Sequence, residues 1–163
     1  MKNLWAPWRM KYIKKAVSKK PEKCIFCSKP KENRDSKNYI LYRGRKCFVI
    51  MNLFPYNNGH LMIAPYKHAA SLASLDDETL LEIMVLLKKA ELILKKTFNP
   101  DGFNIGVNIG RTAGAGIDKH VHFHIVPRWN GDTNFLPVID GTKVIVQSMQ
   151  EAYRMLSGHF KNI

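Results

Sequence analysis

Several short apolar stretches of the chain are bounded by turn-forming residues, which is typical of β-strands, and residues 103–109 also alternate apolar with polar positions. The strands predicted in this way are residues 38–43, 46–51, 60–64 and 103–109. A fifth strand is predicted in KHVHFHIVPRW, residues 119–129, where Val121, Phe123 and Ile125 alternate with histidines and are expected to face the core. Pro127 has no amide proton to donate to a neighbouring strand, so this strand is expected to end there.

Two helices are predicted from a period of 3.6 residues. The longer one, residues 77–98, carries a stripe at i, i+3, i+4 and i+7 spacing that is expected to face the core. The stripe comprises Leu80, Ile83, Met84, Leu87, Ala90 and Leu94, with one charged exception, Glu91. A shorter amphipathic helix is predicted over residues 147–160. The order of these elements favours an α+β fold, an antiparallel sheet with helices packed on one face.

The length of 163 residues and a hydrophobic content of 45% predict one domain with one substantial core. No apolar run approaches the roughly 18 residues of a membrane span, and the N-terminus is too polar for a signal peptide. We therefore expect no membrane association and a cytoplasmic location. The three cysteines do not form a disulfide framework, because their number is odd.

The positive charge is concentrated near the N-terminus. Residues 1–46 carry 15 Lys and Arg against 3 Asp and Glu, so they hold nearly all of the net charge of +13. Such an arm could attract nucleic acid or nucleotides, or it could simply keep the protein soluble. Residues 1–23 also contain Trp5 and Trp8, so this extension is expected to pack on the domain formed by residues 24–163, although aromatics beside cations could also stack on bases.

His120, His122 and His124 recur at every second residue, which on a strand places their imidazoles on one face, roughly 7 Å apart. Half of the six histidines lie in these five residues. Three interpretations are open at this point. The row could be a polar strand face, a three-histidine zinc site, or a nucleophile with neighbours that orient it and bind phosphoryl oxygens.

Cys24 and Cys27 form a C-x-x-C pair, which could supply two ligands of a tetrahedral metal site. No second pair exists in the chain, so histidines would have to complete such a site. His68, after the predicted third strand, is a plausible ligand. A thioredoxin-like redox role is disfavoured because Pro21 and a charged stretch precede the pair and Pro30 follows it.

The histidine row resembles the His-φ-His-φ-His-φ-φ signature of the histidine triad (HIT) family, where φ is an apolar residue. The resemblance extends to the C-x-x-C pair, to the segment from Asn52 through Gly59-His60-Leu61 to His68, and to Asn108-Ile109-Gly110. It implies the HIT-like fold, a five-stranded antiparallel sheet with one long helix and a C-terminal helix. The motifs WAPWRMKYI and PRWNGDTNF resemble a bacterial branch related to diadenosine tetraphosphate phosphorylases and hydrolases.

The resemblance implies nucleotidyl transfer from an α-phosphate. His122 would be the nucleophile that forms a covalent nucleotidyl-imidazole, His124 would bind phosphoryl oxygens, and His120 would support the site. Water or inorganic phosphate would then release the nucleotide. The nucleotide, expected to carry adenine, would contact Phe26, Asn52, Leu53, Asn108, Gly116, Ile117, His122 and His124. The alternatives are a nucleotide- or nucleic-acid-binding regulatory protein and a purine nucleoside phosphoramidate hydrolase.

The resemblance also implies a structural zinc ion held by Cys24, Cys27, His68 and His120, and a homodimer formed through the long helix and the adjacent strand. One feature departs from the family. Many relatives carry Gly-Gln-Ser/Thr shortly before the triad, whereas this chain has Gly114-Ala115-Gly116-Ile117. Backbone amides near Gly116 and Ile117 would therefore have to assist the phosphate, as glycine-rich phosphate-binding loops do.

Overall fold

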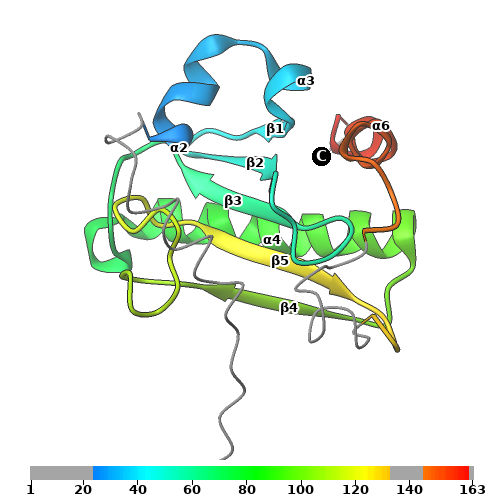
Figure 1. Cartoon of the computed structure of the whole chain (residues 1–163). Helices are drawn as coiled ribbons and strands as arrows, with labels where there is room; N and C mark the ends of the chain where they lie inside the picture. Colours follow the sequence, from blue (N-terminus) through cyan, green and yellow to red (C-terminus); the bar gives the residue numbers. More distant parts are fainter. Residues whose placement is uncertain (1–23, 133–144, 162–163) are drawn as a thin grey trace, which may run out of the picture.

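The structure, a computed structural model, describes residues 24–132 and 145–161 (Figure 1). The predictions for the basic extension, residues 1–23, lie outside these residues. The strands are β1 (Ile40–Arg43), β2 (Cys47–Met51), β3 (Leu61–Pro65), β4 (Gly102–Val107) and β5 (Phe123–Arg128). The helices are α2 (Ile25–Ser28), η1 (Lys29–Glu32), α3 (Asp35–Asn38), η2 (Leu72–Ser74), α4 (Asp77–Phe98) and α6 (Met149–Phe160).

The five strands form one sheet in the order β1-β2-β3-β5-β4, and every neighbouring pair is antiparallel. The predicted five-stranded antiparallel sheet is confirmed. Because β5 inserts between β3 and β4, the segment before β5 lies beside the segment that follows β3. This crossover brings residues near position 120 close to residues near position 68.

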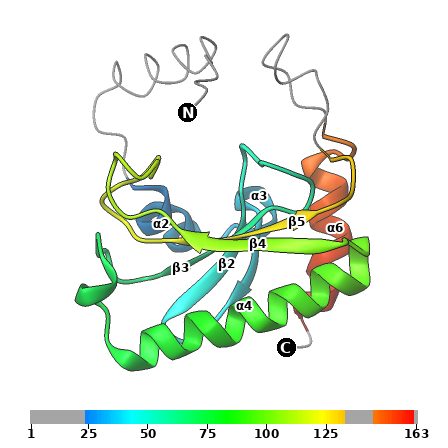
Figure 2. The ribbon, with the colours of Figure 1, turned by 90° about the horizontal axis from the view of Figure 1, so that it is seen from below.

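The two faces of the sheet have different cores, since neighbouring residues of a strand point to opposite faces. Val49 and Ile63 belong to the larger cluster, which α4 and α6 cover, whereas Phe48 and Met62 belong to a smaller cluster around Phe26. Viewed from the β4 edge, α4 lies on one side of the sheet and α2 on the other (Figure 2). The prediction of helices on one face is right for the two long helices and wrong for α2, which covers part of the opposite face.

The long helix α4 has the predicted bounds but a different buried stripe. Met84 is 58% exposed and Glu91 is also exposed, so both were placed wrongly in the core. The buried positions are instead Thr79, Ile83, Leu86, Leu87, Ala90, Ile93 and Leu94. No helix in the described ranges combines the length and apolarity that crossing a membrane requires.

The strand that carries the histidines is shorter at its start than predicted. It begins at Phe123, so His120 and His122 precede it, and it continues through Pro127 to Arg128. The carbonyl of Pro127 accepts a hydrogen bond from the Asn57 side chain on the β3 side, beyond the last β3 residue paired with β5, Leu61. The backbone nitrogen of Pro127 faces the same side, where β3 no longer pairs with β5. The lack of an amide proton on Pro127 therefore costs no hydrogen bond in the sheet.

Candidate active site and metal centre

The three predicted histidines meet on the sheet face opposite α4. The ring centroids of His122 and His124 are 4.9 Å apart, and the ring of Phe26 lies 4.7 Å from His122 and 5.2 Å from His120. Val121 and Ile125 point to the other face, into the larger core, as predicted. The row is therefore assembled as the spacing indicates, although only His124 belongs to a strand.

The hydrogen bond of His122 defines which of its nitrogens is free. Its Nδ1 lies 2.8 Å from the backbone carbonyl oxygen of His120, and a carbonyl oxygen can only accept. The proton of the neutral ring is therefore on Nδ1, and Nε2 keeps its lone pair. Burial lowers the pKa of His122, which favours this neutral form. A neutral imidazole with a free Nε2 is a competent nucleophile toward phosphorus.

His124 has the opposite arrangement, and a fourth histidine imposes it. The backbone amide of Tyr56 donates to Nδ1 of His60 over 3.0 Å, so His60 carries its proton on Nε2. That nitrogen lies 2.9 Å from Nδ1 of His124 and donates to it. The neutral His124 ring consequently carries its proton on Nε2. Burial, and secondarily the nearby His122, lower the pKa of His124 to about 4.

Sequence reasoning treated His60 only as part of a family motif and gave it no role. Its ring is 1% exposed and is covered by the half-exposed ring of Tyr56, whose centroid lies 4.8 Å from His60 and 6.0 Å from His124. The register pairs Met62 with His124, which places His60 diagonally across the sheet from His124 on the same face. The signal that could have found it is the polar residue at the start of an otherwise apolar strand.

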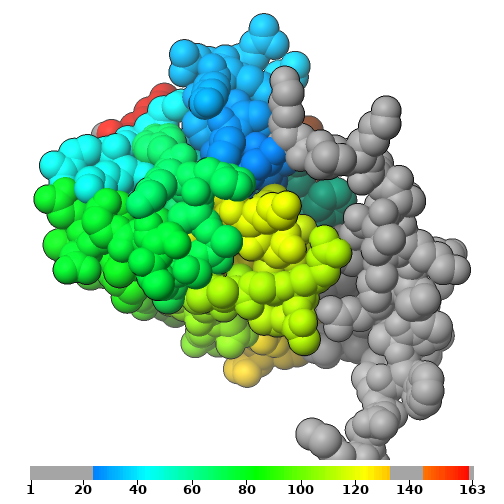
Figure 3. Space-filling view, turned by 90° about the vertical axis from the view of Figure 1, so that its left-hand side faces the viewer, coloured from blue at the N-terminus to red at the C-terminus, as the bar shows by residue number. Residues whose placement is uncertain are grey.

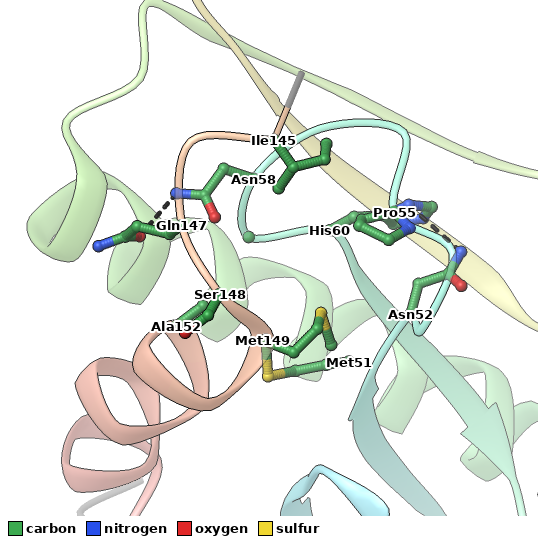
Figure 4. A pocket seen from close by; sticks show the side chains of 11 residues that line it. Met51, Asn52, Pro55, Asn58, His60, Ile145, Gln147, Ser148, Met149 and Ala152 are labelled. Atoms are coloured by element: carbon green, nitrogen blue, oxygen red, sulfur yellow. Dashed lines mark hydrogen bonds between the residues drawn. The ribbon is translucent and has the colours of Figure 1, made fainter. Parts of the chain in front are cut away.

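The loop between β2 and β3, residues 52–60, holds His60 in place. Asn52 donates from Nδ2 to Nδ1 of His60 over 3.3 Å and accepts from the amide of Phe54 over 2.9 Å. On the far side of the loop, Asn58 donates to Gln147 over 2.8 Å, just before α6 begins (Figure 4). The residue Gln147, two positions before α6, therefore braces the loop that sets the tautomer of His124.

The predicted nucleotide-binding residues differ in burial and in their distance from the triad along the chain. Phe26 is 1% exposed and packs beneath the imidazoles, whereas Leu53 is 43% exposed on the loop before β3. Asn108 follows Val107, the partner of Phe123, so it lies opposite His122. A side chain at Gly114 would come within 3.9 Å of the Asn108 amide. Gly116 is exposed, and Ile117 packs against the smaller core.

Cys24, Cys27, His68 and His120 converge, and their potential ligand atoms all lie within 4.8 Å of one another. The Sγ of Cys24 is 3.3 Å from Nδ1 of His120, and the Sγ of Cys27 is 3.2 Å from Nδ1 of His68. The two Nδ1 atoms are 3.2 Å apart. In a tetrahedral zinc site the ligand atoms are roughly 3.3–3.8 Å apart. The four residues could therefore hold a metal ion with little rearrangement.

The orientation of His120 supports this interpretation. Its Nε2 donates to the carbonyl oxygen of Pro65 over 2.9 Å, so Nδ1, which faces the other three groups, keeps its lone pair. Ligand histidines are commonly held by such a bond from the second nitrogen. Figure 3 shows three parts of the chain side by side on one surface of the molecule. They are the start of the described residues (blue), the segment after β3 (green) and the segment before β5 (yellow).

Comparison with known proteins gives consistent results. Residues 33–131 match the HIT domain family. The chain is 37% identical over 162 residues to a Mycobacterium tuberculosis protein named AP-4-A phosphorylase, covering 96% of this chain and 83% of the relative. A histidine triad nucleotide-binding protein from Sulfolobus tokodaii shares the fold, with a TM-score of 0.66 and 30% identity over 85% of this chain and 90% of that one.

A second solved structure is a Zn-bound histidine triad family protein from Mycobacterium smegmatis. Its TM-score is 0.68, its identity is 22%, and the match covers 90% of this chain and 96% of that chain. At that identity the likeness establishes the shared fold alone.

Proposed function

The chain belongs to the HIT domain family, and from this membership and the geometry of the triad we propose that it cleaves dinucleoside polyphosphates of the diadenosine tetraphosphate type at an α-phosphate. The observation that carries the proposal is the pair of opposite tautomers on His122 and His124. One ring presents a lone pair and its neighbour presents a proton. The similarity to a protein named AP-4-A phosphorylase supports the choice of substrate.

In the first step, the lone pair on Nε2 of His122 attacks the α-phosphorus. A phosphorus–nitrogen bond forms, and the bond from phosphorus to the oxygen of the departing polyphosphate breaks. The Nε2–H of His124 donates a hydrogen bond to a phosphoryl oxygen and stabilises the negative charge that builds up in the transition state, and the polyphosphate leaves as an anion. The carbonyl oxygen of His120 keeps the Nδ1 proton of His122 in place while the ring gains positive charge.

In the second step, an incoming acceptor displaces His122. If the acceptor is water, its oxygen bonds to phosphorus, its proton passes to solvent, and the bond from phosphorus to Nε2 of His122 breaks, while the Nε2–H of His124 again donates to a phosphoryl oxygen. If the acceptor is phosphate, the product is a nucleoside diphosphate. We propose that Asn52 and Asn108 contact the ribose and the phosphate, and that the glycine loop before the triad supplies backbone amides in place of the hydroxyl and amide side chains of other relatives.

We also propose that the Cys24, Cys27, His68 and His120 cluster holds a structural zinc ion. Two thiolates and two imidazoles suit zinc, and a site with four protein ligands leaves no position for substrate. The ion would tie the N-terminal end of the domain to the segments that flank β3 and β5. None of the catalytic steps above passes through it.

A homodimer is the third part of the proposal. Within residues 24–132 and 145–161, β4 pairs with β5 only, and the other edge of a strand offers backbone groups with which a second chain can pair. Apolar side chains are exposed on α4 and on β4, with Leu81 at 66%, Leu92 at 65% and Ile105 at 48% exposure. Exposed apolar side chains and a strand edge without a described partner are both suited to pairing with another copy.

The test of the catalytic proposal is incubation with diadenosine tetraphosphate, with and without inorganic phosphate, followed by product analysis. His122→Ala should lose on the order of 10⁴-fold or more of the turnover, because the nucleophile is absent. Mass spectrometry of quenched wild-type enzyme should find a nucleotidyl adduct on the peptide that contains His122. His159→Ala, a histidine variant on α6, is the matched control and should turn over substrate as wild type does.

Equal turnover by wild type and His122→Ala would refute the proposed role of His122. A dependence of the rate on phosphate, with a nucleoside diphosphate as product, identifies phosphorolysis, whereas nucleoside monophosphate formed without phosphate identifies hydrolysis.

A further inference from the structure

One peptide group lies between the metal cluster and the nucleophile, and it is bound on both sides. The peptide that joins His120 to Val121 donates its N–H to the carbonyl oxygen of Ala69 over 2.7 Å. Its carbonyl oxygen accepts the Nδ1 proton of His122 over 2.8 Å. The group that determines the tautomer of His122 is therefore itself oriented by the segment that follows β3.

This peptide group is linked to two of the proposed ligands, His68 and His120. Ala69 directly follows His68, and the peptide begins at the Cα of His120, whose side chain faces Cys24, Cys27 and His68. His68 is exposed, and Ala69 precedes a segment without long regular structure. An ion shared by His68 and His120 would fix the distance between the two segments and, with it, the direction of the carbonyl.

The cluster reaches the nucleophile by a second contact. Phe26 lies between the two cysteines, and its ring packs 4.7 Å from His122 at an interplanar angle of 36°. Its position in the short helix α2 depends on where Cys24 and Cys27 are held, since the helix has only four residues. Binding of the cysteines to an ion would keep this ring against the imidazole.

We propose that the metal centre positions the nucleophile: the bound ion holds the His120–Val121 peptide, and this peptide holds His122 with Nδ1 protonated and Nε2 free. The inference rests on the metal site and the nucleophile proposed above. It adds a functional dependence to them, because a centre that only stabilises the fold would leave the tautomer of His122 unchanged once the protein is folded.

The experiment compares zinc-loaded protein, protein stripped with a chelator, and stripped protein given Zn²⁺ again, all at one fixed pH. Nitrogen-15 NMR of the histidine rings reports the tautomer of His122, and hydrogen exchange reports the protection of the Val121 amide. On stripping, we expect the two ring nitrogens of His122 to give averaged signals and the Val121 amide to exchange at least tenfold faster. Added Zn²⁺ should reverse both changes, while the Ile63 amide, in the middle of β3, stays protected throughout.

Two substitutions at His68 separate loss of the ion from loss of a side chain. His68→Ala removes one ligand and should behave as the stripped protein does. His68→Cys keeps four ligands in a Cys₃His set, which also binds zinc, and should retain the defined tautomer. Cys47→Ala, which alters a cysteine buried in the larger core, should leave His122 as in wild type.

The proposal is overturned if metal analysis shows that zinc has been removed and the signals of His122 and the exchange of Val121 do not change. It is also overturned if protein purified or supplied with Zn²⁺ holds no ion. These readouts do not depend on turnover. An enzyme with a metal-dependent tautomer and no activity on diadenosine tetraphosphate would contradict the proposed reaction instead.

Discussion

Nε2 of His60 lies 2.9 Å from Nδ1 of His124, and this contact gives His124 the tautomer opposite to that of His122. The amide of Tyr56, which can only donate, determines the direction of the bond by occupying the other nitrogen of His60. Two histidines of one row thereby acquire different chemistry from different backbone groups. A lone pair and a proton are presented side by side to the same phosphate.

His60→Leu should lower turnover of diadenosine tetraphosphate by about 10²–10³-fold, because His124 would no longer be held with its Nε2–H directed at the phosphoryl oxygens. His60→Gln should recover a large part of the rate, since its amide can still donate to Nδ1 of His124. Steady-state kinetics of the two variants check this. If leucine and glutamine reduce the rate equally, the hydrogen bond to His124 is not what matters at position 60.

Gly59→Ala should destabilise the fold by about 2 kcal/mol or more and reduce activity as well. Gly59 has a φ of 71°, and an added Cβ would lie 2.9 Å from the Phe98 ring and 3.1 Å from Leu94. Relief of this crowding would move the neighbouring His60. Urea unfolding measures the change in free energy. Gly102→Ala is the control, because a Cβ there meets nothing within 4 Å, and a similar loss in both variants would contradict the argument.

Stability should fall as the pH is lowered from about 6.5 toward 4. An unfolded histidine binds its proton near pH 6.5, whereas burial lowers the pKa of His124 in the folded protein to about 4. In that window the unfolded state binds more protons, so acid favours unfolding. The pKa values of His120 and His122 are lowered too, in each case mainly by burial, and act in the same direction. Urea midpoints between pH 7 and pH 4.5 measure the effect, and His124→Gln should flatten the slope.

Leu92→Lys should shift the protein from dimer to monomer, because a charge would be placed on the exposed apolar surface of α4. Analytical ultracentrifugation gives the mass. Val146→Lys changes an apolar side chain that is 78% exposed and lies outside α4 and β4, so it should leave the mass unaltered. A monomeric wild type, or a dimer that tolerates Leu92→Lys, would show that α4 is not the pairing surface.

Affinity for single-stranded oligonucleotides should depend on residues 1–20, which contain seven Lys and Arg and no acidic residue. If all seven contact phosphates, deleting the segment should reduce the slope of log affinity against log salt by roughly 5. Fluorescence anisotropy at several salt concentrations measures the slope. A full-length variant with glutamine at these cations separates charge from chain length. Failure of the wild type to bind at low salt removes nucleic acid as a partner.

The sequence was most informative where the structure follows from neighbouring residues. Alternation along a strand depends only on local backbone geometry, so the residue types at positions 120–125 predicted which side chains there share a face. The long helix was found with its bounds. Its buried stripe was partly wrong at Met84 and Glu91, because periodicity shows which residues share a face but not how wide the covering surface is. The covered width depends on the sheet and on α6.

The sequence by itself determined that three imidazoles stand in one row and that two cysteines in a C-x-x-C pair could supply half of a metal site. Only the tertiary structure decided what each imidazole does. The acceptors at Pro65 and His120 and the donor at His60 leave a lone pair on Nδ1 of His120, a lone pair on Nε2 of His122 and a proton on Nε2 of His124. For His120 and His124 these partners lie more than 50 positions away along the chain and meet the row through the pairing of β3 with β5. A tautomer is set by the atom that a ring nitrogen faces, and that atom is known only once the strands are in register.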